Sequence, residues 1–158
     1  MSGKYSVKKY ISGDAIANRI VIMDKIAEIQ YAFHRDRIGG TIWLPSGIVE
    51  VDGEISIDSY GPTIKGEGPG STLVKSVGES KNIFRFRPNS GMGGISDLSF
   101  EADRPKMAIC EDDGDFTGLV NGGGCFSDFH NLTFRDGIHT GIRVGIRSNK
   151  QLPEFPIN

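Results

Sequence analysis

The chain has 158 residues, with 18 Lys and Arg against 20 Asp and Glu, and a formal net charge of −2. This length corresponds to one domain, and the near-neutral charge argues against a dedicated nucleic-acid-binding protein, which carries a basic surplus. Hydrophobic residues make up 37% and charged residues 24%, which suits a packed core and excludes a disordered chain. No apolar run approaches about 18 residues and the start MSGKYSVKKY has no apolar segment, so neither a membrane span nor a secretory signal peptide is expected.

The first predicted element is an amphipathic helix. Asp14 is a good N-cap residue, and residues 15–37 contain neither Gly nor Pro. Positive charge near the end of this segment suits a helix C-terminus, and Gly39-Gly40 stops the helix. The apolar run 20–23, IVIM, is also compatible with a short strand, and that alternative stays open. The apolar stripe consists of Ile22, Ile26, Ile29 and Phe33, widened in its first half by Ile16, Ile20 and Met23.

Beyond Gly40 the apolar period changes from that of a helix to that of a strand. Short β-type runs alternate with turns rich in Gly, Pro and Asn, which accounts for the 22 glycines. Such a pattern suits a sandwich, a barrel or a β-solenoid. The predicted strands are 41–44, 48–51, 55–58, 63–66, 72–76, 82–87, 98–101, 107–110, 129–135 and 141–144.

An internal repeat favours the solenoid. The segment 95–101, ISDLSFE, recurs 34 positions later as 129–135, FHNLTFR. Self-similarity of this kind indicates stacked copies of one supersecondary unit. Stacking would bring Leu98 onto Leu132 in an inward column, with Phe100 on Phe134 beside it. The remaining pairs are expected as Asp97 with Asn131 at a corner, and Ser99 with Thr133 and Glu101 with Arg135 pointing outward.

Two further motifs carry a family resemblance. They are 39–47, GGTIWLPSG, and 64–73, IKGEGPGSTL. Together they resemble the opening of the pectate-lyase-like single-stranded right-handed β-helix proteins, a family that includes many phage tailspikes and polysaccharide-degrading enzymes. The Asp-rich entry that precedes the helix in that family is reduced here to Ser12-Gly13-Asp14.

The resemblance implies an all-β fold, a short right-handed parallel β-helix of about four or five coils capped by one N-terminal α-helix. The expected organisation is an N-terminal arm and capping helix over 1–38, β-helix coils over 39–147, and a C-terminal tail over 148–158. The tail contains two prolines and no amphipathic helix, so it is a poor cap for the last coil. The open coil is therefore expected to be covered by identical chains, a homotrimer being favoured, or by another spike or virion protein.

Candidate site residues follow from the same reading. Outward arginines and carboxylates suit the binding of acidic glycans; these are Arg85, Arg87, Glu101 and Arg135. For Arg85 and Arg87 an ordinary charged outer face is the somewhat favoured alternative. Asp97 and Glu101 are candidates for a catalytic carboxylate pair, although four residues across a corner do not favour one shared substrate. Asp112, Asp113 and Asp115 offer oxygen ligands for Ca²⁺, but a solvated turn is the preferred interpretation, so no metal and no cofactor is expected. Trp43 is expected to pack beneath the helix rather than to stack on a sugar.

The leading functional hypothesis is a virion component, a spike- or fibre-type module that binds cell-surface glycan or anchors a longer spike. The alternative is a polysaccharide lyase or glycoside hydrolase, or a piece of one, with catalysis the less favoured option. The expected location is a virion appendage or the extracellular space. Cys110 and Cys125 lack a CxxC neighbour and are expected as two thiols rather than a disulfide or a zinc site.

Overall fold

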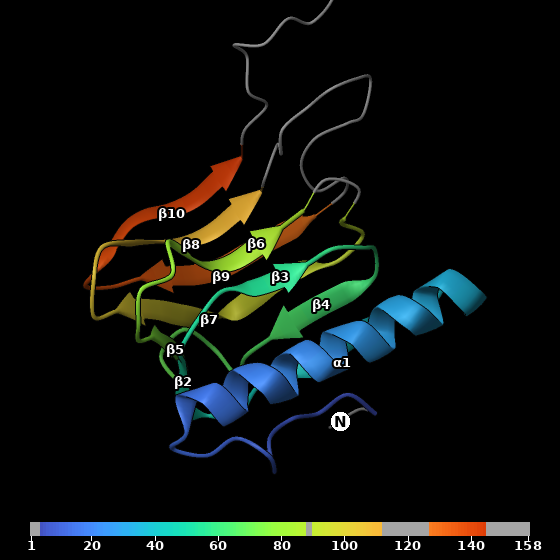
Figure 1. The fold of residues 1–158 in the computed structure, drawn as a ribbon, viewed down its shortest axis with the longest axis horizontal. Coiled ribbons are helices and arrows are strands. Elements are labelled where there is room, and N and C mark those ends of the chain that lie inside the picture. The colour runs from blue at the N-terminus through green and yellow to red at the C-terminus, as the bar shows by residue number, and fades with distance from the viewer. Residues whose placement is uncertain (1–3, 88–89, 112–126, 145–158) are drawn as a thin grey trace, which may run out of the picture.

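The computed structural model describes residues 4–87, 90–111 and 127–144. Within these ranges one helix is followed by ten strands (Figure 1), so each predicted segment is confirmed with ends that shift by a few residues. The elements are α1 (Ala15–Asp36), β1 (Gly40–Trp43), β2 (Gly47–Val51), β3 (Ile55–Ile57), β4 (Pro62–Lys65), β5 (Thr72–Ser76), β6 (Asn82–Phe86), β7 (Gly94–Ala102), β8 (Lys106–Glu111), β9 (Asp128–Phe134) and β10 (Ile138–Val144). In this part of the chain no helix has the length and apolarity needed to cross a membrane.

Helix α1 begins and ends as its sequence predicts. The Asp14 carboxylate accepts hydrogen bonds from the amides of Ile16 and Ala17, at 3.0 and 3.1 Å. Arg37 closes the helix in a left-handed conformation, and its amide donates to the Phe33 carbonyl oxygen. The strand alternative for 20–23 was therefore wrong.

Only part of the predicted stripe of α1 is buried. Its four central members, Ile22, Ile26, Ile29 and Phe33, are buried as expected. Ile16 and Ile20, which were predicted to widen that face, are 55% and 49% exposed, and Met23 is half-buried. At 100° per residue Ile16 and Ile20 lie on a different side of the helix from the buried stripe and point away from the core, whereas Met23 packs against the edge of the core cluster.

All pairings between these strands are parallel. β1, β2 and β3 pair with β4, β5 and β6, in that order. β4 pairs with the first part of β7, β5 with its second part, and β6 with β8. β7 and β8 then pair with β9 and β10. The result is a six-stranded and a four-stranded sheet, and a sandwich of antiparallel layers is excluded for these strands.

The register of the internal repeat is confirmed. Leu98 pairs with Leu132, and Phe100 with Phe134. The two phenylalanine rings are stacked with centroids 5.8 Å apart and planes 8° from parallel. Ser99 is an exception to the prediction, because it is fully buried and its hydroxyl donates to the Thr72 carbonyl oxygen at 3.3 Å.

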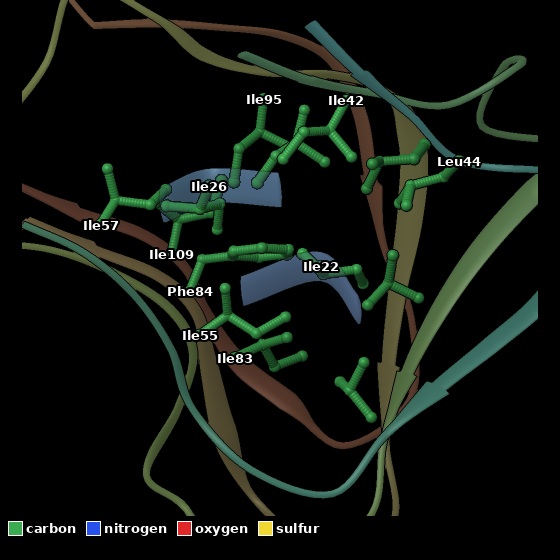
Figure 2. Close-up of a cluster of buried hydrophobic side chains, with 14 of the residues drawn as sticks. Ile22, Ile26, Ile42, Leu44, Ile55, Ile57, Ile83, Phe84, Ile95 and Ile109 are labelled. Atoms are coloured by element: carbon green, nitrogen blue, oxygen red, sulfur yellow. The ribbon is translucent and has the colours of Figure 1, made fainter. Parts of the chain in front are cut away.

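Inward columns of apolar side chains from successive strands form the core. Ile42, Ile64 and Ile95 make one column across the first sheet, and all three are fully buried. Figure 2 shows Ile22 and Ile26 of α1 reaching into the same cluster. Burial of each such side chain stabilises the fold by about 1.5–3 kcal/mol.

The two ends of the stacked strands differ in how far other parts of the chain cover them. At the first end, α1 contacts β1, β2, β3 and β4, and the Val7 amide donates to the Trp43 carbonyl oxygen beside β1. At the other end, Phe134 of β9 and Ile142 of β10 are 38% and 37% exposed, although their partners Phe100 and Ile109 are fully buried. Within the described residues, no further strand pairs with the outer edges of β9 and β10.

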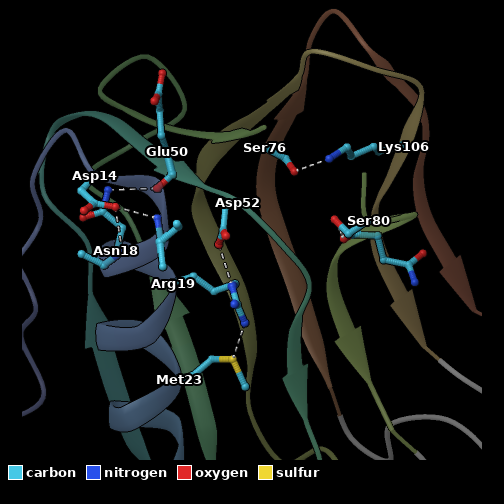
Figure 3. Close-up of polar contacts among 12 residues, drawn as sticks. Asp14, Asn18, Arg19, Met23, Glu50, Asp52, Ser76, Ser80 and Lys106 are labelled. Carbon is cyan, nitrogen blue, oxygen red and sulfur yellow. Dashed lines mark hydrogen bonds and ion pairs between the residues drawn. The ribbon is translucent and has the colours of Figure 1, made fainter. Parts of the chain in front are cut away.

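Two buried polar side chains, Asn18 and Lys106, have specific hydrogen-bond partners (Figure 3). The buried Asn18 of α1 donates to the carbonyl oxygens of Ser12 and Glu50, at 2.9 Å each, and accepts from the Ser12 amide. Lys106 is buried at the start of β8, and its ammonium donates to Ser76 Oγ and the Gly78 carbonyl oxygen, at 2.8 Å each. These contacts tie the helix to β2 and tie β8 to the end of β5.

Candidate functional site

A row of charged side chains crosses the outer surface of the six-stranded sheet, and we call it the charged ladder. It consists of Glu50, Lys75, Glu101 and Arg135. The residues that precede the first three are fully buried apolar residues, so strand alternation turns the ladder outward. Its signs alternate from one strand to the next. This arrangement brings opposite charges together along the stacking direction.

The register fixes the neighbours within the charged ladder. Lys75 pairs with both Glu50 and Glu101, and its Nζ lies 3.8 Å from Glu101 Oε1. The Arg135 amide donates to the Phe100 carbonyl oxygen at 2.8 Å, which continues the β7–β9 ladder and places Arg135 beside Glu101, as predicted. Half-exposed ion pairs of this kind contribute about 0–1 kcal/mol each, so these groups can exchange partners with a ligand at small cost.

A polar corner lies beside the charged ladder, where β7 turns. Asp97 and Asn131 both have positive φ values, 58° and 50°, which Asp and Asn tolerate better than most residues. Asn131 Nδ2 donates to Asp97 Oδ1 at 2.6 Å, and Ser96 Oγ donates to Asp97 Oδ2 at 3.1 Å. Lys65 Nζ lies 3.5 Å from Oδ2. These contacts, the Asn131 hydrogen bond first, lower the pKa of Asp97 and keep it ionised.

Asp97 and Glu101, the candidate catalytic pair, contact different partners. Asp97 sits at the corner with its oxygens occupied by Asn131, Ser96 and Lys65. Glu101 lies on the second part of β7 and faces Lys75. The lowered pKa of Asp97 suits an ionised carboxylate and not the general-acid role of such a pair.

Trp43 is on the outer surface, which corrects its predicted place beneath the helix. Its neighbours Ile42 and Leu44 are fully buried, so alternation turns the half-buried indole outward. Lys65 pairs with Trp43 in the β1–β4 register, and its ammonium lies 5.2 Å from the centroid of the indole ring. Lys65 thus bridges Trp43 and Asp97, a role that the sequence did not reveal because it depends on the β1–β4 register.

The four predicted glycan-binding residues fall on two different sheets. Glu101 and Arg135 belong to the charged ladder. Arg85 lies on β6 of the four-stranded sheet, 3.8 Å from a carboxylate oxygen of Glu54, and Arg87 follows β6, 3.6 Å from Asp58. The structure therefore brings together Glu101 and Arg135, and separately Arg85 and Arg87, but not all four.

The predicted metal ligands Asp112, Asp113 and Asp115 lie outside the described residues, as does Cys125. Cys110 on β8 is buried. Across the ranges that are described, no group of three or more His, Cys, Asp or Glu side chains has the proximity needed to hold a metal ion.

The histidines are placed individually rather than as a cluster. The Nε2 atom of His34 lies 2.8 Å from Ser59 Oγ near the end of α1, and Nδ1 of His130 lies 3.1 Å from Asp128 Oδ2 on β9. These exposed contacts tie each ring to its local surface.

Comparison with known proteins yields no match to a family model, to a curated protein or to a solved structure. The chemistry of the charged ladder and the difference between the two ends of the fold therefore carry the functional argument.

Proposed function

We propose that the chain is a right-handed parallel β-helix of four coils that serves as a spike- or fibre-type module of a virion, binding cell-surface glycan or anchoring a longer spike. In this reading β1–β3, β4–β6, β7–β8 and β9–β10 each make one coil. The repeating parallel register supports the winding. Residues 39–47 and 64–73 resemble the opening of the pectate-lyase-like β-helix proteins, a family that includes phage tailspikes, and this resemblance motivates the virion setting.

The difference between the two ends is the observation that carries the proposal. α1 covers the first strands, whereas Phe134 and Ile142 on the last strands stay more than a third exposed. Unpaired strand edges recruit further strands or chains. A module that continues or anchors a larger appendage uses such an end for attachment, through two more copies of itself or through another spike protein.

The charged ladder is the proposed glycan contact. A guanidinium binds a carboxylate through two parallel hydrogen bonds, and a carboxylate accepts from sugar hydroxyls. Arg135 and Glu101 offer both groups side by side on an outward surface. We therefore propose glycans that contain uronic or other acidic sugars as ligands.

Glycan-array binding and affinity measurements on uronate-containing polysaccharides test this site. We expect Arg135→Ala to weaken binding about tenfold, which corresponds to the loss of one charge-assisted contact. Arg104→Ala is the matched control, because Arg104 is an exposed arginine that pairs with Glu79 and is not a member of the charged ladder. Equal weakening by both variants, or no binding to any acidic glycan, would contradict the proposed site.

Incubation of the protein with the same polysaccharides distinguishes binding from cleavage. The proposal predicts that polysaccharide chains stay intact. Unsaturated products or new reducing ends would instead establish the alternative, a polysaccharide lyase or glycoside hydrolase.

A further inference from the structure

Strand β9 has one paired edge and one open edge. It pairs with β7 on one side, and within the described residues no strand pairs with its other side. An edge of this kind accepts an added strand through backbone hydrogen bonds, and the side chains beside it decide which sequence fits. The side chains of β9 therefore define the chemistry of a strand that can be added.

The corner residue Asn131 leaves a hydrogen-bond acceptor open. Its Nδ2 donates to Asp97 Oδ1 at 2.6 Å, and among the described residues no group donates to its own Oδ1. The two atoms point in different directions on a planar amide, so Oδ1 turns away from Asp97. An asparagine placed next in this stack would donate to Asn131, whereas an aspartate would present a second acceptor.

The charged ladder ends on a cation without an ion pair. Its signs alternate from Glu50 to Lys75 to Glu101 across successive strands, and Lys75 Nζ lies 3.8 Å from Glu101 Oε1. Arg135 continues the alternation, but no carboxylate in the described part of the chain forms an ion pair with its guanidinium. A carboxylate on an added strand would continue the ladder and supply that partner.

An aromatic column also ends on β9. The rings of Phe100 and Phe134 are stacked with centroids 5.8 Å apart, and Phe100 is fully buried whereas Phe134 is 38% exposed. Leu132, which pairs with the fully buried Leu98, is half-buried in the same way. An added aromatic residue beside Phe134 and an added leucine beside Leu132 would remove this apolar surface from water.

We propose that the open edge of β9 binds an extended segment of a partner chain as an added parallel strand. The strand carries asparagine beside Asn131, an aromatic residue beside Phe134 and a carboxylate beside Arg135. Its pattern is that of 95–101, ISDLSFE, with asparagine in place of the aspartate. This inference rests on the attachment end of the proposed function and names the chemistry of what attaches there.

Binding of synthetic peptides to the full chain tests the pattern, measured by fluorescence polarisation. The peptide ISNLSFE is expected to bind about tenfold more tightly than ISDLSFE or ISNLSFR, because each of these loses one polar contact and gains a repulsion. In the Arg135→Glu variant the order of ISNLSFE and ISNLSFR is expected to reverse. Arg104→Glu is the matched control, because it makes the same charge change at an exposed arginine that is not a member of the charged ladder.

Cysteine pairing tests the direction of the added strand. Parallel pairing brings the cysteine of a peptide ISNLCFE beside residue 133, so a disulfide with Thr133→Cys is expected. An antiparallel strand would bring the same cysteine beside residue 131, and preferential linkage to Asn131→Cys would contradict the parallel register. The unsubstituted chain, which keeps Cys110 and Cys125, gives the background.

The outcomes separate this inference from the proposed function. Equal binding of the three peptides, no binding of ISNLSFE, or no reversal in folded Arg135→Glu overturns the added strand. None of these results bears on glycan binding, so the proposed function would then stand with attachment through another contact. Intact peptide binding without glycan binding would instead remove the glycan contact and leave the added strand.

Discussion

Asp97 and Asn131 show how short polar residues recur where the chain makes the same turn twice. Both adopt positive φ at the corner of successive strands, and the Asn131 amide donates to the Asp97 carboxylate. Short polar side chains tolerate this backbone conformation and bond to one another in the stacking direction. The corner is therefore fixed by backbone conformation and by a side-chain hydrogen bond together.

The contacts of Asp97 at this corner should make the unfolding free energy of the protein depend on pH. The pKa of Asp97 is lowered, chiefly by Asn131 and further by Ser96 and Lys65. Such a carboxylate adds stability that is fully present above its unfolded pKa of about 3.9 and is lost as the pH falls through the lowered folded value. We expect Asp97→Asn to flatten the acid decline of the unfolding free energy, measured by urea denaturation at a series of pH values. Identical acid declines in the two proteins would contradict this role.

Lys106 adds a second rise of stability with pH, on the alkaline side. Burial lowers the pKa of its ammonium, and within the described residues only Ser76 and Gly78 accept hydrogen bonds from it. The unfolded chain then holds the proton at pH values where the folded chain has released it, so this group makes stability rise as the pH increases toward about 10.4.

Lys106→Met tests this effect, because it keeps the length of the side chain and removes the charge. We expect thermal unfolding of the variant between neutral pH and pH 10 to show a smaller gain in stability than the wild-type chain. A variant with an undiminished gain would show that another group causes the alkaline dependence.

At the scale of the element, α1 depends on its first turn. Asp14 satisfies two amides that the helix itself leaves without acceptors. Asp14→Ala is expected to lower the unfolding free energy by about 1 kcal/mol, and Asp14→Ser to restore most of it, since Ser also caps well. Urea denaturation followed by circular dichroism measures both. Equal stability of the Ala and Ser variants would contradict the cap.

The strands and the repeat register were predictable because they depend on local pattern. Alternation of apolar residues marks each strand, and the likeness of 95–101 to 129–135 sets one register directly. The burial of Ser99 was not predictable, because strand alternation gives its direction but not the cover that neighbouring strands provide.

The candidate site was predictable only in part for a similar reason. Glu101 and Arg135 come together because the repeat aligns them. Arg85 falls on a different sheet, and the contact of Trp43 with Lys65 depends on a β1–β4 offset that no repeated motif reveals. Contacts between elements that lack a shared motif are set by packing of the whole chain.

At the scale of the molecule, the stacked strands have one covered end and one exposed end. α1 and the segment around Val7 cover the first strands, and the last strands carry half-exposed apolar side chains. The proposal of a spike-type module follows from this difference between the two ends.

The central claim is that equivalent residues of successive turns lie side by side in a parallel register. The most direct measurement is disulfide formation in the double variant Glu101→Cys/Arg135→Cys, located by peptide mass mapping. Adjacent parallel strands lie about 4.8 Å apart, a distance that a disulfide bridges. The account predicts a near-complete bridge in this variant and little in Glu101→Cys/Thr133→Cys, which is shifted by two residues on the same surface. Preferential bridging of the shifted pair, or no bridge in either folded variant, would contradict the account.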